Sequence, residues 1–186
     1  DGGFWGFQVR DKEECKESVL NAIRAGYRLI DTAASYTNED AVGEAVREAI
    51  AEGICTREEL FITSKMWVQD MQNYEMAKKA IDHSIETLGV EYLDLYLLHQ
   101  AMKDYFSAWR AMEDAYKEGK LRAIGVFQFL SSCADKLLRD RSDPSDGQPD
   151  RNASVFHTGA CVKSYGRVPG RAGGMGTARR RPSQSV

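Results

Sequence analysis

The 186-residue sequence lacks the features that mark membrane, secreted and metal-binding proteins. No apolar run approaches the 18 or more residues of a membrane span, and no basic-then-apolar leader opens the chain. The four cysteines, Cys15, Cys55, Cys133 and Cys161, show neither C-x-x-C nor metal-ligand spacing, so we expect reduced thiols. These absences predict a soluble, cytoplasmic protein with no metal site and no membrane partner.

Glutamate is missing from the last 60 residues, since the final glutamate is Glu118. Up to Val126 the chain has 15 Lys and Arg against 23 Asp and Glu, a balance of −8, whereas the remainder has 10 against 5, a balance of +5. That remainder is also rich in Arg, Ser, Gly and Pro, which predicts an irregular, disordered tail over 127–186 after a folded domain over 1–126. Its basic residues are scattered without aromatic residues between them, so we expect no nucleic-acid partner. A binding module built on the basic tail is the weakest alternative.

Apolar residues recur at helical spacing in four segments, and short apolar runs separate these segments. Helices are predicted at 12–25, between a cap at Asn38 and a stop at Gly53, at 74–88 and at 105–118. Strands are predicted at 4–9, 27–31, 60–65, 92–99 and 123–126. Because strands and helices alternate, the sequence predicts an α/β fold with about five parallel strands and four helices.

The predicted fold is an incomplete (β/α)8 TIM barrel, because a complete eight-stranded barrel needs roughly 250 residues. About three strands are missing, which leaves two sheet edges open. Open edges of a parallel sheet favour self-association.

Four candidate site residues, Asp31, Tyr36, Lys65 and His99, stand at or just beyond the ends of consecutive predicted strands. In a parallel barrel these carboxyl ends converge on one face, where active sites lie. A tyrosine with a pKa near 10 transfers protons near neutrality only when a cation stabilises its phenolate, and Lys65 can supply that cation. The constellation suits proton delivery to an oxygen while another agent supplies hydride.

Each of these residues also has a purely structural interpretation. Asp31 suits a turn or a helix cap, Tyr36 suits packing in a loop, and His99 suits a core position. Lys65 is harder to explain structurally, because a lysine at the end of an apolar strand needs a partner. Their joint placement favours chemistry.

Four segments carry a resemblance to a known family. They are GYRLIDTAASY at 26–36, with Asn38-Glu39 and VGEA following, LFITSKMW at 60–67, YLDLYLLH at 92–99 and GKLRAIGV at 119–126. In this order they closely resemble the signatures of the aldo-keto reductases, over about residues 4–126. The resemblance implies that Tyr36 is the general acid, that Lys65 lowers its pKa, that Asp31 pairs with Lys65, and that His99 orients the substrate carbonyl.

The resemblance also implies a substrate and a cofactor. It implies NADPH as the hydride donor, with Asp31 at the cofactor site, and a small-molecule carbonyl substrate, an aldehyde or ketone reduced to an alcohol. Phe7 and Trp67 are expected to line the substrate pocket.

The sequence departs from the family after Val126. Family members continue Ser-Asn-Phe, whose Ser and Asn hold the nicotinamide amide, whereas this chain has Phe127-Gln128-Phe129. Reverse translation with a one-base shift at Phe127 can restore Ser-Asn-Phe and a later family strand, so we hypothesise that 127–186 is an out-of-frame tail. The sequence therefore predicts weak NADPH binding and impaired activity. The alternative is a catalytically inactive barrel fragment from a frameshifted gene.

Overall fold

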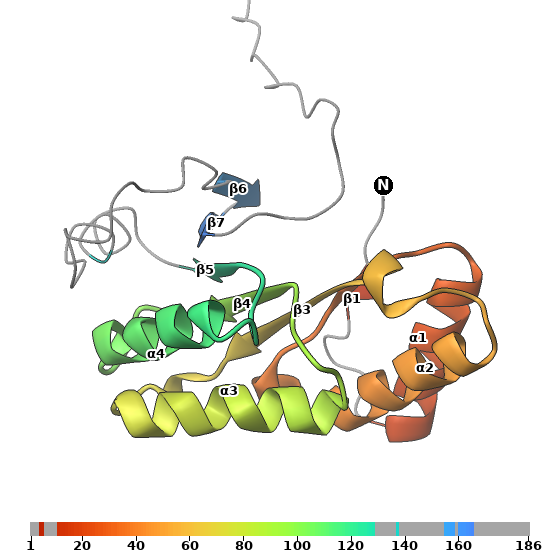
Figure 1. The fold of residues 1–186 in the computed structure, drawn as a ribbon, viewed down its shortest axis with the longest axis horizontal. Coiled ribbons are helices and arrows are strands. Elements are labelled where there is room, and N and C mark those ends of the chain that lie inside the picture. The colour runs from red at the N-terminus through yellow and green to blue at the C-terminus, as the bar shows by residue number, and fades with distance from the viewer. Residues whose placement is uncertain (1–3, 6–10, 129–136, 138–154, 159, 166–186) are drawn as a thin grey trace, which may run out of the picture.

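The computed structural model describes residues 4–5, 11–128, 137, 155–158 and 160–165, and within them strands and helices alternate (Figure 1). The strands up to residue 128 are β1 (Phe4–Trp5), β2 (Leu29–Asp31), β3 (Phe61–Met66), β4 (Leu95–Leu98) and β5 (Ile124–Val126). The helices are α1 (Lys12–Arg24), α2 (Glu39–Ala51), α3 (Tyr74–Leu88) and α4 (Tyr105–Lys117). Three short 3-10 helices connect them: η1 (Ala34–Tyr36), η2 (Arg57–Glu59) and η3 (Val68–Asp70).

Each strand from β1 to β4 pairs in parallel with the next strand along the chain. The core of this sheet is β2 to β5, and the two-residue β1 extends it by one strand. The prediction of about five parallel strands and four helices is confirmed. Parallel pairing needs a crossover helix between successive strands, which α1 to α4 supply.

Local sequence signals explain most helix ends. The side chain of Asp11 accepts a hydrogen bond from the backbone N–H of Glu14 and caps α1, and Asn73 caps α3 in the same way. Gly89 ends α3 with a φ of 63°, a left-handed conformation that suits glycine. Asn38 stands at the predicted cap position of α2, but its side chain makes no capping bond. Its amide oxygen instead accepts a hydrogen bond from the hydroxyl of Thr32.

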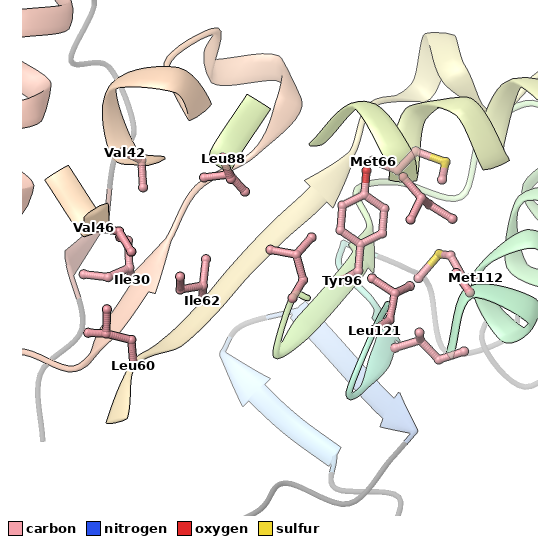
Figure 2. Packing of buried hydrophobic residues seen from close by; sticks show 14 of the residues in the cluster. Ile30, Val42, Val46, Leu60, Ile62, Met66, Leu88, Tyr96, Met112 and Leu121 are labelled. Atoms are coloured by element: carbon pink, nitrogen blue, oxygen red, sulfur yellow. The ribbon is translucent and has the colours of Figure 1, made fainter. Parts of the chain in front are cut away.

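The hydrophobic core lies between the sheet and the helices that cover one of its faces. Ile30 of β2 and Ile62 of β3 are fully buried there, near Val42 and Val46 of α2 (Figure 2). Further along the sheet, Tyr96 of β4 belongs to the same cluster. Strand side chains alternate between two faces, so the residues between these core positions point to the opposite face of the sheet.

That opposite face has a smaller apolar cluster and all of the site described below. Leu95, Leu97 and Ala123 are buried in it, and Phe61 and Phe127 pack against them. Asp31, Thr63 and Lys65 share this parity along β2 and β3. The sheet thus has an apolar helix-covered face and a second face on which charged side chains emerge at the strand ends.

A hairpin lies within the segment predicted to be irregular. Strands β6 (Val155–Thr158) and β7 (Ala160–Tyr165) pair antiparallel with each other, and β7 pairs antiparallel with β5. The sequence analysis did not predict these strands, because each is short and no helix follows it. One sheet edge predicted to be open, that of β5, therefore has a neighbour, and the edges of the described sheet are β1 and β6. The sequence also allows one turn of helix at 134–139, of which the structure describes residue 137 alone.

No helix in the described part of the chain is long and apolar enough to cross a membrane.

Candidate active site

The four candidate residues come from three neighbouring segments at the carboxyl end of the sheet. Asp31 is the last residue of β2, and Tyr36 ends the 3-10 helix η1 that follows it. Lys65 is the penultimate residue of β3, and His99 directly follows β4. Because β2, β3 and β4 are parallel and in register, their ends bring these side chains to one place.

Lys65 is the centre of the cluster. Its side chain is 1 % exposed, and its Nζ donates to Asp31 Oδ1 at 2.5 Å, to the carbonyl oxygen of Thr32 at 3.0 Å and to Tyr36 Oη at 3.4 Å. These three acceptors match the three donors of an ammonium group. The lysine that the sequence analysis found hard to explain structurally is therefore fully satisfied by the residues around it.

Burial acts on both members of the ion pair. It raises the pKa of the Asp31 carboxyl, and the neighbouring Lys65 opposes that rise. It also lowers the pKa of the Lys65 ammonium, and Asp31 opposes that fall. Each charge thus depends on the other to remain in a site that water scarcely reaches.

The pKa of Tyr36 is raised above its usual value, first by burial and then by the negative charge of Asp31. The resemblance implied the opposite direction, a pKa lowered by Lys65. Burial is the larger cause of this rise. Lys65 does not reverse it, since its Nζ pairs with Asp31 at 2.5 Å and lies farther from Tyr36 Oη, at 3.4 Å. Tyr36 is consequently a protonated phenol at neutral pH and holds a proton that it can donate.

His99 is a neutral imidazole at neutral pH. Burial and the nearby charge of Lys65 lower its pKa to about 4. Its ring meets three aromatic rings, those of Trp67 at 5.2 Å, Phe127 at 5.6 Å and Tyr36 at 6.3 Å between centroids. Its Nδ1 is buried and has no hydrogen-bond partner among the described residues, so this nitrogen is available for a further hydrogen bond.

A cavity of about 870 Å3 opens beside Tyr36 and His99. Its size matches that of small-molecule and cofactor sites. It is lined by parts of the η1 loop, of the segment after β3 and of the segments after β4 and β5: Ala34, Ser35, Tyr36, Thr37, Trp67, Gln69, Asp70, His99, Gln100, Phe127 and Gln128. Trp67 lies in this lining, and Phe7, the other predicted pocket residue, lies outside the described residues.

Two lining residues that the sequence analysis did not assign to the site form a polar pair. The amide of Gln100 donates to the amide oxygen of Gln128 at 3.0 Å. Gln128 has a φ of 51°, a left-handed conformation that is uncommon for a residue other than glycine. Each stands two residues after the end of a strand, and that position was the signal available in the sequence.

The lining fits the amide end of a nicotinamide cofactor. The family's asparagine is replaced by Gln128, which keeps a carboxamide at the cavity, while Phe127 replaces the serine and removes a hydroxyl. Two carboxamides at one cavity wall offer both donors and acceptors to another amide. Among the residues described, no cluster of His, Cys, Asp and Glu is arranged to hold a metal ion.

The fold is part of a parallel α/β barrel, with Asp31, Tyr36 and Lys65 brought together at the carboxyl end of its strands. The chain belongs to the Aldo/keto reductase family, whose model matches residues 2–152. This match continues past Val126, where the motifs end, and so covers part of the segment that the reading-frame hypothesis assigns to a tail.

Relatives and solved structures agree with this assignment. The chain is 47 % identical over 152 residues to glyoxal reductase of Bacillus subtilis, which covers 81 % of this chain and 52 % of that protein. It is 43 % identical over 148 residues to morphine 6-dehydrogenase of Pseudomonas putida, covering 78 % and 47 %. The crystal structure of a Bombyx mori aldo-keto reductase in complex with NADP matches with a TM-score of 0.71 at 35 % identity, covering 76 % of this chain and 50 % of that one. The chain thus spans about half the length of the relatives it matches.

Proposed function

We propose that this site reduces small aldehydes and ketones to alcohols with NADPH, and that Tyr36 donates the proton. The observation that carries the proposal is the position of Lys65 Nζ between Asp31 at 2.5 Å and Tyr36 Oη at 3.4 Å, directly behind Tyr36, which lines the cavity. Relatives whose names state a reductase or dehydrogenase activity, and a similar structure that holds NADP, support it. The four residues carry these roles in the proposal.

Each of the four residues has a defined task. The Tyr36 hydroxyl gives its proton to the carbonyl oxygen, and the phenolate that forms lies within reach of the Lys65 ammonium, which stabilises it. Asp31 keeps Lys65 charged in its buried position. The neutral His99 donates its N–H to the carbonyl oxygen and orients it, while water returns the proton to Tyr36 after the reaction.

The cofactor supplies the hydride that reduces the carbonyl carbon, which no side chain can do. Gln100 and Gln128 would hold its amide at the cavity wall, and Asp31 contributes to the same site. With the family's serine replaced by Phe127, we expect binding to be weak, so that activity is limited by the fraction of chain that holds the cofactor.

The test is the loss of NADPH absorbance at 340 nm with glyoxal at high NADPH concentration. We expect a slow rate that exceeds the rate without protein, and a fall of about 10²–10⁴-fold in Tyr36→Phe. Tyr27→Phe is the matched control, because Tyr27 is exposed and lies outside the cavity lining. A parent chain with no activity above the uncatalysed rate would contradict the proposal and favour the alternative, an inactive barrel fragment.

A further inference from the structure

A buried carboxylate behind the site has no task in the proposed reaction. Glu39, the first residue of α2, is 5 % exposed. Its Oε1 accepts a hydrogen bond from Ser64 Oγ at 2.6 Å, and its Oε2 accepts one from Ser84 Oγ at 3.3 Å. Ser64 belongs to β3, and Ser84 belongs to α3 and also meets the hydroxyl of Tyr96 at 3.2 Å. A buried acid of this kind costs free energy unless its oxygens are satisfied, so its two hydroxyl partners call for an explanation.

The first partner of Glu39 is the neighbour of Lys65 along β3. Successive residues of a strand point to opposite faces, so Ser64 points toward the helices while Lys65 points into the site. Glu39 therefore binds β3 from the helix-covered face of the sheet, at Ser64, the residue directly before Lys65.

The segment that bears Tyr36 is fastened to β3 at both of its ends. At its start, Lys65 Nζ donates to the carbonyl oxygen of Thr32. At its end, Glu39 accepts from Ser64. Thr32 and Asn38 also join the two ends directly, through the bond from Thr32 Oγ1 to Asn38 Oδ1 at 3.2 Å.

These contacts form a closed circuit: Lys65, Thr32, Asn38, Glu39 and Ser64, then back to Lys65 along the chain. Every side chain in it is buried. Tyr36 lies on the loop that the circuit closes, two residues before Asn38. The loop also contains Thr37 with a φ of 56°, a strained conformation that a surrounding structure has to hold in place.

We propose that Glu39 is a positioning residue that clamps the Tyr36 loop onto β3 and thereby sets the contact between Tyr36 Oη and Lys65 Nζ. For its consequence in catalysis this inference rests on the proposed function. The positioning itself does not depend on any cofactor or substrate. Since a misplacement of about 1 Å can cost on the order of 10²-fold in rate, a clamp on this loop has a large effect on the reaction.

Four variants test the clamp, because each removes or keeps a different set of the hydrogen bonds of Glu39. Glu39→Ala removes both bonds, and Ser64→Ala removes only the bond to β3. Ser84→Ala removes only the bond to α3 and is the matched control. Glu39→Gln keeps an acceptor for Ser64 and offers an N–H to Ser84, whose hydroxyl can accept it, so it should behave like the parent.

The decisive readout is the phenol titration of Tyr36, measured as absorbance at 295 nm with the signal of Tyr36→Phe subtracted. In the parent we expect Tyr36 to titrate above the ordinary pKa of 10, as its burial beside Asp31 requires. In Glu39→Ala and Ser64→Ala the loop moves away from Lys65 and the half-buried Tyr36 hydroxyl becomes more exposed, so the titration should move down toward 10. In Glu39→Gln and Ser84→Ala it should stay at the parent value.

Two results would overturn the proposal: a Tyr36 titration in Ser64→Ala that equals the parent's, or one that Ser84→Ala shifts as much as Ser64→Ala does. If circular dichroism shows that Glu39→Ala does not fold, Ser64→Ala decides, because it removes a single hydroxyl. The kinetic counterpart is a kcat lower by about 10²-fold in Ser64→Ala with an unchanged KM for the aldehyde. A protein without activity whose titrations follow the expected pattern would disprove the proposed function and leave the clamp in place.

Discussion

The two ends of the same parallel strands each bury an ion pair, but the pairs are built differently. At the carboxyl end, one lysine, Lys65, meets one aspartate, Asp31, beside a cavity. At the amino end, Asp94 meets two arginines, Arg57 at 2.9 Å and Arg122 at 3.4 Å. Asp94 precedes β4, and the arginines come from η2 before β3 and from the segment before β5.

Several kinds of contact hold the amino-end cluster, although Arg57 Nε and Tyr92 Oη are buried with no hydrogen-bond partner among the described residues. Asp94 also accepts the backbone N–H of Ile62 at 3.0 Å. The guanidinium groups of Arg57 and Arg122 lie over the ring of Tyr92, at 4.0 and 3.6 Å from its centroid. Carboxylate, backbone and aromatic ring together hold both arginines in place, and none of these residues lines the site cavity.

The choice of cation indicates what each end is suited to do. An arginine keeps its charge under all ordinary conditions, so an ion pair built on arginine is permanent and links neighbouring strands. A buried lysine changes its pKa with its surroundings and can respond when a neighbouring phenol loses a proton. In parallel barrels the carboxyl end carries the chemistry and the amino end contributes stability, and the residues at these two ends follow that division.

The greatest loss of stability is expected at the amino end. Asp94→Ala leaves Arg57, whose side chain is 14 % exposed, as an uncompensated buried charge, and should lower the free energy of unfolding by about 3–5 kcal/mol. Urea denaturation measures this. The control is Asp82→Ala, which breaks the exposed pair with Lys120 and should cost about 0–1 kcal/mol. Equal losses of unfolding free energy in the two variants would show that the buried pair at the amino end stabilises the fold no more than a surface pair does.

A smaller loss is expected at the carboxyl end. Asp31→Asn leaves Lys65 buried without its carboxylate and should cost about 1–3 kcal/mol at pH 7, because the lysine can give up its proton. Burial lowers the pKa of Lys65 and Asp31 opposes that fall, so removing the carboxylate lowers this pKa further. Below the ordinary lysine value of 10.5 the stability of the variant therefore rises with pH more than that of the parent. The deficit of Asp31→Asn relative to the parent should therefore shrink between pH 7 and pH 9.5.

The deficit of Asp94→Ala should stay constant over the same interval, because arginine does not titrate there. Urea denaturation of both variants at the two pH values makes the comparison. A deficit that shrinks equally in both would show that the lysine and arginine ends do not differ in the way we describe.

His99 affects stability on the acid side. Its pKa of about 4 lies below the ordinary 6.5, so the unfolded chain binds more protons between these values and stability falls as the pH is lowered through this window. His99→Gln removes this contribution. The difference in unfolding free energy between parent and variant should change by up to about 1.4 kcal/mol per pH unit between pH 6.5 and pH 4. Parallel stability curves would mean that His99 is not held neutral.

The weakest effect separates the two arginines. The side chain of Arg122 is 30 % exposed and lies 3.4 Å from Asp94, so Arg122→Met should cost only about 0.5–1 kcal/mol, mostly from its lost contact with Tyr92. Arg57→Met should cost more, because Arg57 also donates to two backbone carbonyl oxygens, those of Leu60 and Tyr92. Thermal denaturation ranks the two variants, and the reverse order would contradict the geometry.

The sequence predicted the elements up to Val126 well, because periodicity and end signals agree there. The bounds predicted for α3, 74–88, match the structure, and the predicted strand at 92–99 contains β4. The alternation of strand and helix was also enough to predict that Asp31, Lys65 and His99 stand at strand ends.

What the sequence did not predict depends on three-dimensional contacts. The raised pKa of Tyr36 follows from the burial of its hydroxyl and from the nearby charge of Asp31, which no spacing along the chain specifies. Glu39 and Ser84 are 45 residues apart, so their contact is invisible to a local pattern. The hairpin β6–β7 was missed because strands of four and six residues in a Gly- and Ser-rich region give a weak signal.

We propose that the reaction takes place at the carboxyl end of the sheet and that the residues at the amino end hold the strands together. The decisive comparison is the initial rate of NADPH oxidation with glyoxal in Tyr36→Phe and in Arg122→Met, at equal concentrations of folded protein. We expect Arg122→Met to reduce glyoxal at the parent's rate, whereas Tyr36→Phe should be slower by about 10² or more. A Tyr36→Phe variant as fast as the parent, or an Arg122→Met variant as slow as Tyr36→Phe, would contradict this division of tasks.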